Sequence, residues 1–371
     1  MPLTLLTTAL LYMIGSATLA AVLSPFITKL LYHFNITRRA EHDYTLQGEA
    51  RAHKAGTPIM GGLIVVITIL IITLATNWDR RFTYVPIGVM GISALLGATD
   101  DLLSTFGGKR RSRGLSQTRT LIAVHKSWGM KIWLTITLPW VAFRSVTGLF
   151  GSKPGRGVHV HEKLLLQFIA GAIAAWWIYF KLGPYWTTLW IPFDGQVSIG
   201  FLMIPLIIFF VMLTANAVNI ADGLDGLAGG SLVATFSALT LLSTVANIPP
   251  LAFLNATAAG ALITYTYFNI KPARFQMGDV GSLGLGALLA INTIALNKTL
   301  LLPFLGFIFY LETVSVIIQV LSRRLLGKRV FKMAPLHHHL EFSGWSEEKI
   351  VMRFWLIHIF FVILGLWVAL R

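Results

Sequence analysis

The polar residues with the most regular spacing lie between two long apolar runs, in the stretch NAVNIADGLDGLAGG that begins at Asn216. Asn216, Asn219, Asp222 and Asp225 recur every three residues, so on a helical end their side chains share one face. The glycines that follow allow the backbone to turn and to approach a ligand closely. Such a row suits phosphates, sugars and a hard cation. The alternative is a connecting turn in which Asn and Asp only cap the helices.

Three more acidic positions could take part in the same chemistry. Asp100 and Asp101 end an apolar run in GATDDLLS. Neighbouring residues of a helix point about 100° apart, so one carboxylate could act on a metal or a proton while the other is structural. Asp279 begins a run after Pro272, where the helix dipole favours an anion. The alternatives are a solvated helix end for the pair and an N-terminal cap for Asp279.

Basic and histidine-containing clusters provide further candidates. Lys54, in RAHKAGTPIMGG, could hold a phosphate, or it could be an ordinary loop lysine. The segment PLHHHLEFSGW contains His337, His338 and His339, and adjacent residues rarely all reach one zinc ion, so binding of phosphate or sugar oxygens is favoured. Glu312 lies inside an apolar run, which makes it a functional candidate. It could instead be a buried residue that is hydrogen-bonded to a neighbouring helix.

The composition is that of a membrane protein. Of the 371 residues, 55% are hydrophobic, 12% are charged and none is cysteine. Uniformly apolar runs near the length of a bilayer crossing predict helices rather than barrel strands. The sequence therefore predicts an all-α polytopic membrane protein, a single integral domain over 1–371 with about ten transmembrane helices. The predicted spans are 3–31, 59–76, 84–103, 163–182, 198–219, 230–247, 251–268, 280–296, 300–322 and 351–370.

The net charge of +15 is concentrated in alternate loops, which the positive-inside rule places in the cytoplasm. Both termini are then outside, and the polar clusters face the cytoplasm. Because the basic residues flank spans, nucleic acid is not an expected partner. The long cytoplasmic loop 104–162 contains a Trp-rich apolar segment near 130–150. As another span it would invert every later loop, so we expect an interfacial or re-entrant insertion.

The polar clusters all fall on one predicted side of the membrane, and together they suit phosphoryl transfer. In that chemistry, carboxylates hold a divalent ion while cationic and polar groups fix the phosphates. The hydrophobic spans would let one reactant be a lipid phosphate. An ion-coupled transporter is an alternative of another class, but it predicts acidic residues near mid-membrane in broken helices. Most of the acidic residues here lie at the ends of runs.

The ordered motifs GTPIMGG, DD, NAVNIADGLDGLAGG, FNxxPAxxxMGDVGSL, ETVSVIIQV and PLHHHLEFSGW resemble those of the bacterial phospho-N-acetylmuramoyl-pentapeptide transferases. The resemblance covers nearly the whole chain except about 115–160. A wider superfamily of polyprenyl-phosphate sugar-1-phosphate transferases shares the acidic motifs, and the triple histidine points to the muramoyl-pentapeptide branch. The resemblance implies a ten-helix enzyme of the bacterial inner (plasma) membrane, homodimeric in the bilayer, with its active site facing the cytoplasm.

The resemblance also implies a reaction. Phospho-MurNAc-pentapeptide would pass from UDP-MurNAc-pentapeptide to undecaprenyl phosphate, giving lipid I and UMP in peptidoglycan biosynthesis, with Mg²⁺ as the cofactor. A sibling transferase that uses UDP-GlcNAc is the alternative. Direct attack and a phospho-aspartyl intermediate both stay open.

Carried onto this sequence, the resemblance implies Asp279 as the magnesium ligand, Asp100 as the base, Asp101 as a support for the site and His338 as a further catalytic residue. The family usually has an aromatic residue, resembling a stacking partner for uracil, where this sequence has Gln276, and Phe275 is the candidate replacement. The implied substrate-binding residues are Lys54, Asn216, Asn219, Asp222, Asp225, Asn269, Gln276, His337 and His339.

Overall fold

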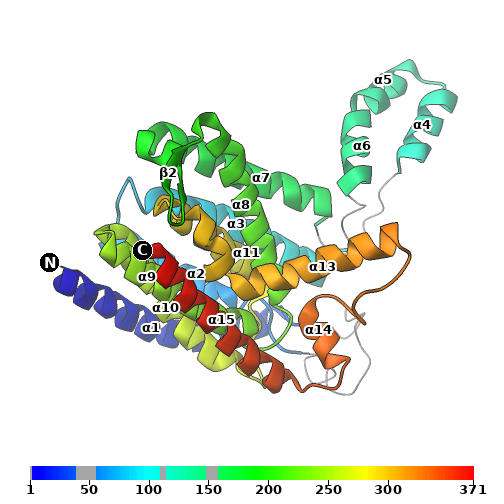
Figure 1. The fold of residues 1–371 in the computed structure, drawn as a ribbon. Coiled ribbons are helices and arrows are strands. Elements are labelled where there is room, and N and C mark those ends of the chain that lie inside the picture. The colour runs from blue at the N-terminus through cyan, green and yellow to red at the C-terminus, as the bar shows by residue number, and fades with distance from the viewer. Residues whose placement is uncertain (1, 39–55, 109–113, 148–157) are drawn as a thin grey trace.

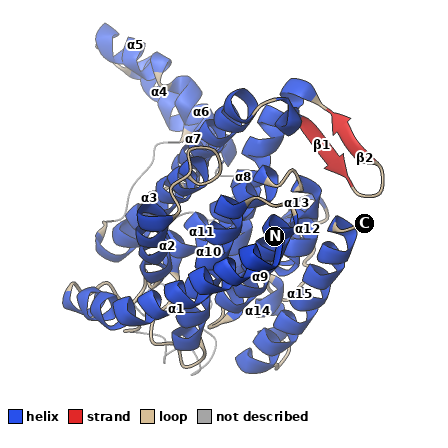
Figure 2. Cartoon of the chain, turned by 90° about the vertical axis from the view of Figure 1, so that its left-hand side faces the viewer, coloured by secondary structure: helices blue, strands red, loops and turns tan. Residues whose placement is uncertain are grey.

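The computed structural model describes residues 2–38, 56–108, 114–147 and 158–371. Those residues form a bundle of helices with one small hairpin (Figures 1 and 2). The long helices are α1 (Pro2–His33), α2 (Gly62–Thr76), α3 (Tyr84–Phe106), α7 (Val160–Trp177), α8 (Met203–Ala221), α9 (Leu227–Val245), α10 (Pro249–Asn269), α11 (Gly278–Ala295), α13 (Phe307–Leu325) and α15 (Glu347–Ala369).

Shorter elements connect these helices. The short α-helices are α4 (Leu115–Val124), α5 (Trp128–Ile136), α6 (Leu138–Thr147), α12 (Leu302–Leu305) and α14 (Leu336–Glu341). A π-helical turn, Ile178–Leu182, continues α7, and 3-10 turns occupy Pro184–Thr187, Gly200–Leu202 and Thr299–Leu301. Strand β1 (Thr188–Ile191) pairs antiparallel with β2 (Gly195–Ser198).

The prediction of an all-α polytopic membrane protein is confirmed. Among the described residues, eight helices are long and apolar enough to cross a membrane. A ninth is added if Thr299–Leu305 and Phe307–Leu325, which meet at 86°, form one broken span. The helix α2 is apolar but has only 15 residues. Each predicted run contains a long helix, although 198–219 begins in β2 and 300–322 is broken at Gly306, and both termini lie on the left of Figure 1. The count of ten spans and the outside location of the termini stay predictions.

Local sequence explains where two central helices end. Helices α9 and α11 are followed by Asn247 and Asn297, whose φ angles are 54° and 53°. Asparagine is the residue after glycine that most readily adopts this left-handed conformation, which stops a helix. Helices α9 and α11 therefore both end two residues before an asparagine, close to the predicted ends of the runs at 247 and 296.

Helix α11 forms the centre of the bundle, because all its residues from Val280 to Ala295 are buried. Small residues allow its neighbours to approach closely. A Cβ atom at Gly286 would lie 2.8 Å from the Cα of Ala215 on α8, and one at Gly97 on α3 would lie 2.1 Å from the carbonyl oxygen of Asp279. The close approach of α3 and α8 to α11 brings their polar ends together.

Buried polar side chains fix the contacts among three of the central helices. Asn292 of α11 donates to Asn255 of α10 across 2.7 Å, and Asn255 donates to Ser243 of α9 across 3.0 Å. All three residues are fully buried. A shift of any of these helices would break hydrogen bonds that no water can replace, so the chain of bonds specifies one arrangement.

The Trp-rich segment forms three helices, α4, α5 and α6, which project from the bundle as an arm (Figures 1 and 2). We call residues 115–147 the arm. Its helices have 10, 9 and 10 residues, fewer than the roughly 20 that a transmembrane helix needs. Its interfacial or re-entrant position stays a prediction.

We expect Gly97→Ala to destabilise the protein by about 1–3 kcal/mol, because the added methyl group would meet backbone of α11 that cannot move freely. Gly91→Ala on the same helix is the control, since nothing lies within 4 Å of its added Cβ atom. Thermal unfolding of both purified variants in detergent measures the effect. Equal unfolding temperatures for the two variants would contradict this account of the packing.

Candidate active site

Lys163 lies where four helices meet, and its ammonium group joins two of the predicted acidic residues. Its Nζ atom is 2.7 Å from Oδ2 of Asp279 and also pairs with Oδ2 of Asp100. Asn219 of α8 donates to Oδ1 of Asp279 across 2.7 Å. We call Asp100, Lys163, Asn219 and Asp279 the Lys163 cluster. It unites the ends of α3, α7, α8 and α11.

The sequence interpretation missed Lys163. It lies four residues after His159, at the start of an apolar run that follows a basic loop, and there it looks like an ordinary lysine on the cytoplasmic flank. The signal that could have distinguished it was its position relative to Gln167, one helical turn later. Gln167 is also buried, which indicates that this face of α7 points into the bundle.

The two neighbouring aspartates have different environments. Asp101 accepts hydrogen bonds from the backbone N–H groups of Asp279 and Val280, each 3.1 Å long. Its carboxylate therefore caps the N-terminus of α11, where an anion is favoured. Asp100 pairs with Lys163, and its other oxygen accepts from the backbone N–H of Val158 across 2.6 Å. Asp101 of α3 thus caps the first turn of α11, which contains Asp279. Asp279 does not provide this cap itself.

Asn216 and Asn219 connect α8 to different neighbours. Asn216 donates to Oε1 of Gln167 on α7 across 2.7 Å. Asn219, one turn later, also donates to Oγ of Ser282 on α11 across 2.9 Å. The two amides therefore lie on the side of α8 that faces the Lys163 cluster, and they hold α7 and α11 beside it.

The loop after α8 is held by its own set of partners. Gly226 has a φ angle of 84°, a conformation that favours glycine, and its N–H donates to Oδ1 of Asn269 across 2.9 Å. The N–H of Asp225 donates to Glu347 of α15 across 2.9 Å, and Trp355 of α15 donates to the Gly226 carbonyl across 3.2 Å. Asp225 and Asn269 are both buried, whereas Asp222 of the same loop is half-buried. The last helix of the chain therefore helps to shape this loop.

Lys271 strengthens the link between the end of α10 and the start of α15. Its Nζ atom lies 2.8 Å from Glu348 and 3.6 Å from Glu347. The hydrogen bond with Glu348 raises the pKa of the Lys271 ammonium above its ordinary value. Lys271 therefore keeps its positive charge beside the two glutamates.

The three successive histidines point to different partners. His337 packs against the loop after α8, since a Cβ atom at Gly223 would lie 2.3 Å from its Nε2. His338 lies 2.6 Å from Glu341, and His339 accepts from the backbone of Lys332 across 3.2 Å. The His337 ring thus contacts the Asn216 stretch at Gly223. Within the described part of the chain, no three His, Cys, Asp or Glu side chains form a group that could hold a metal ion by themselves.

Glu312 supports the first of these histidines. It is fully buried, and it accepts from the backbone N–H of His337 across 3.1 Å, while its second oxygen lies 3.2 Å from Nδ1 of the same ring. Glu312 is thus a buried residue that is hydrogen-bonded to the neighbouring helix α14. This is the second of the two interpretations that the sequence allowed for it. Its carboxylate fixes where His337 meets Gly223.

Two other predicted site residues, Gln276 and Phe275, make side-chain contacts with residues outside the Lys163 cluster. The Gln276 side chain accepts from Arg38 across 3.2 Å. Phe275 is 1% exposed and packs against Tyr265 and Phe268, so its ring belongs to the core and offers no open face for a base. Lys54 lies outside the described residues.

The arrangement is a pair of carboxylates from different helices that share one ammonium group, beside a glycine-rich loop with buried acceptors. Carboxylate oxygens can ligate a hard cation or accept a proton, and an ammonium group can bind phosphate. The cluster therefore has the groups that phosphoryl transfer requires.

Comparison with known proteins finds relatives along nearly the whole chain. A phospho-N-acetylmuramoyl-pentapeptide-transferase of Leptospira biflexa is 35% identical, and the match covers 96% of this chain and 93% of the relative. Proteins of the same name from Chloroflexus aurantiacus and Desulforamulus reducens are 36% and 35% identical, with 85% and 94% of this chain covered and 78% and 94% of the relatives. Residues 146–297 match the family described as Glycosyl transferase family 4. The chain belongs to the phospho-N-acetylmuramoyl-pentapeptide-transferase family.

Proposed function

We propose that this protein transfers phospho-MurNAc-pentapeptide from UDP-MurNAc-pentapeptide to undecaprenyl phosphate, producing lipid I and UMP for peptidoglycan synthesis. The observation that carries the proposal is the Lys163 cluster, in which carboxylates, an ammonium group and an amide from four membrane helices converge. The names of relatives that match over most of the chain support the same reaction and do not favour a UDP-GlcNAc donor.

The reaction exchanges one phosphoanhydride bond for another. An oxygen of the lipid phosphate attacks the β-phosphorus of the UDP-sugar, the bond from that phosphorus to the bridging oxygen breaks, and UMP leaves with the electron pair. Asp100 accepts the proton of a protonated lipid phosphate, since its carboxylate lies at the cluster. Lys163 holds Asp100 and Asp279 together and provides positive charge for the phosphates.

We propose Mg²⁺ as the cofactor, held by Asp279 with Asp100 beside it. The donor set fits, because carboxylate oxygens from α3 and α11 already converge on the positive charge of Lys163, and Mg²⁺ prefers such oxygens. When bound, the ion would offset the negative charge that develops on the departing UMP. Asn219 orients the Asp279 carboxylate, and Asp101 orients the start of α11.

The setting follows from the reaction. We propose that the chain acts in the bacterial inner membrane as a homodimer, with the Lys163 cluster facing the cytoplasm, where the nucleotide donor is available. The apolar helices keep the protein in the bilayer, from which undecaprenyl phosphate reaches the cluster.

Asp279→Asn should lower magnesium-dependent UMP release from UDP-MurNAc-pentapeptide by roughly 100-fold or more, because it removes a charge that binds the ion and keeps the side-chain shape. Asp194→Asn, in the exposed turn between β1 and β2, is the control and should retain full activity. Turnover is measured with and without undecaprenyl phosphate. Near-normal release by a folded Asp279→Asn protein would reject the metal assignment, and preferential release from UDP-GlcNAc would reject the donor.

Lys163→Met should also reduce turnover by on the order of 100-fold, since it leaves two carboxylates facing each other without a positive partner. Lys163→Arg should recover part of the activity because it restores the charge. Lys181→Met, near the far end of the same helical run on an exposed side chain, should behave like the parent. Full turnover by Lys163→Met at saturating magnesium would show that the ammonium group has no part in the reaction.

A further inference from the structure

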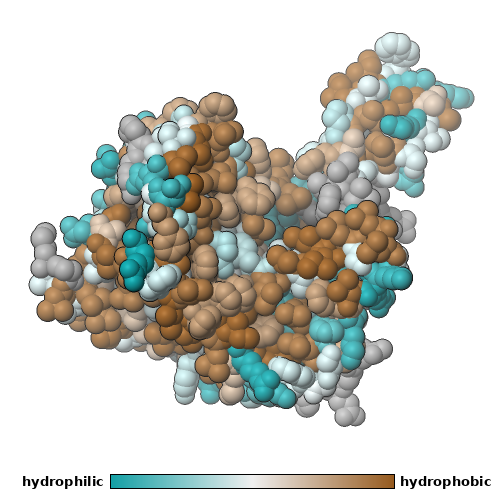
Figure 3. All heavy atoms as spheres, in the orientation of Figure 1, coloured by the Kyte–Doolittle hydropathy of each residue, from teal (hydrophilic) through white to brown (hydrophobic). Residues whose placement is uncertain are grey.

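The arm exposes large apolar side chains that nothing in the described chain covers. Val124, Trp128 and Ile136 are 74%, 78% and 72% exposed. In Figure 3 the arm carries brown, apolar atoms beside teal, polar ones at its outer end. Water-exposed apolar side chains on this scale indicate a surface that another phase or molecule covers.

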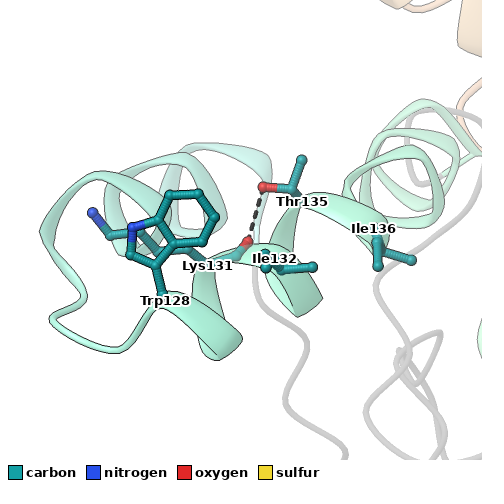
Figure 4. Close-up of a pocket in the computed structure, with 5 residues that line it drawn as sticks. All are labelled: Trp128, Lys131, Ile132, Thr135 and Ile136. Carbon is teal, nitrogen blue, oxygen red and sulfur yellow. Dashed lines mark hydrogen bonds between the residues drawn. The ribbon is translucent and has the colours of Figure 1, made fainter.

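One face of α5 concentrates this surface. Trp128, Lys131, Ile132, Thr135 and Ile136 follow one another at intervals of three, one, three and one residues, which places them on a single helical stripe. They line an open hollow of about 400 Å³ on the arm (Figure 4). The stripe is mostly apolar and ends at a tryptophan, as in helices that lie in the headgroup region of a bilayer.

The charge of the surrounding segment has one sign. Residues 102–161 contain ten Lys and Arg residues and no Asp or Glu. Two of these basic residues are exposed on the arm: Arg119 lies on α4, and Lys126 lies just after it. A segment with this balance is attracted to an anionic surface.

The arm lies in the sequence between two helices that could cross a membrane. The chain enters the arm from α3 through residues 107–114 and leaves it through 148–159 into α7, and both helices are long and apolar enough to cross a bilayer. In Figure 2, viewed from the end where both termini lie, the arm extends past the outline of the bundle. The arm is therefore joined in sequence to two candidate spans and projects to the side of the bundle, which favours a position beside the bilayer.

We propose that the arm docks on the anionic phospholipid headgroups of the bilayer that contains the protein. Trp128, Ile132 and Ile136 insert to the level of the acyl-chain boundary, and Arg119 and Lys126 bind lipid phosphates. The positive charge favours lipid over a second copy of the arm, which would carry the same sign.

The arm contacts the helix that carries Lys163. The ring of Trp140 on α6 contacts the ring of His161 edge-on, with their centres 5.1 Å apart. His161 lies two residues before Lys163, in the first turn of α7. The arm therefore contacts the helical turn that precedes Lys163. The docking itself does not depend on the proposed reaction.

The absence of cysteine from the chain makes a site-specific test possible. A spin label is attached to Ile136→Cys and, in a second protein, to Val124→Cys, both at exposed positions. Each full-length protein is placed, as one copy or as two copies per nanodisc, in phosphatidylcholine alone or mixed with anionic phosphatidylglycerol. Collision rates with oxygen and with a water-soluble nickel chelate report whether each label lies in lipid or in water. A label on Gln196→Cys in β2 is the reference.

We expect both arm labels to be shielded from the nickel chelate in the anionic nanodiscs and more exposed to it in phosphatidylcholine, while the Gln196 label does not change with lipid. Arg119→Glu combined with Lys126→Glu should lower the ratio of embedded to exposed label by about tenfold or more, since each basic residue adds to binding at an anionic surface. Lys328→Glu with Arg329→Glu is the matched control, because it makes the same change of charge at exposed residues away from the arm.

Three results would overturn the proposal. The arm labels could stay accessible to the chelate in both lipids, which would place the arm in water. They could be equally shielded in both lipids, which would remove the role of anionic headgroups. They could also become shielded only when two copies share a nanodisc, which would make this face a contact between copies.

Discussion

Two carboxylates and one ammonium group meet at the ends of helices that are otherwise apolar, and the site depends on their pairing. Asp100 and Asp279 come from different helices, and Lys163 comes from a third. Removing one partner of a half-buried ion pair leaves the other charge with part of its desolvation penalty and without compensation. The cluster therefore constrains how α3, α7 and α11 are placed, and its members serve both structure and chemistry.

The packing of small residues makes this meeting possible. Gly97 lets the end of α3 contact the first turn of α11, and Gly286 does the same between α11 and α8 farther along. Once α3 is that close, Asp101 reaches the free N–H groups at the start of α11. The glycines thus permit one close helix contact, and the cap and the ion pairs follow from that contact. This explains why the adjacent aspartates differ in role.

Much of this arrangement could be predicted from the sequence. The length and composition of the apolar runs were enough to predict an all-α membrane protein, and the spacing of Asn216 and Asn219 placed both amides on one side of α8. The charge pattern alone did not distinguish Lys163 from a flanking lysine, since charge patterns do not reveal which side of a helix faces the bundle. The divergence of the three histidines depends on Glu312 and Gly223, which lie far away in sequence. The burial of Phe275 likewise follows from tertiary packing with Tyr265.

The contacts of α15 with the loop after α8 have a consequence for how the protein is made. Glu347 and Trp355 complete the hydrogen bonds of Asp225 and Gly226, yet they belong to α15, which follows the loop by 122 and 129 residues in the sequence. Domains generally form as the chain emerges, starting from the N-terminal part. Here the earlier helices can enter the membrane and assemble around α11, but the loop cannot take its final shape until α15 has been synthesised. An incompletely synthesised chain would therefore occupy the membrane without a finished site.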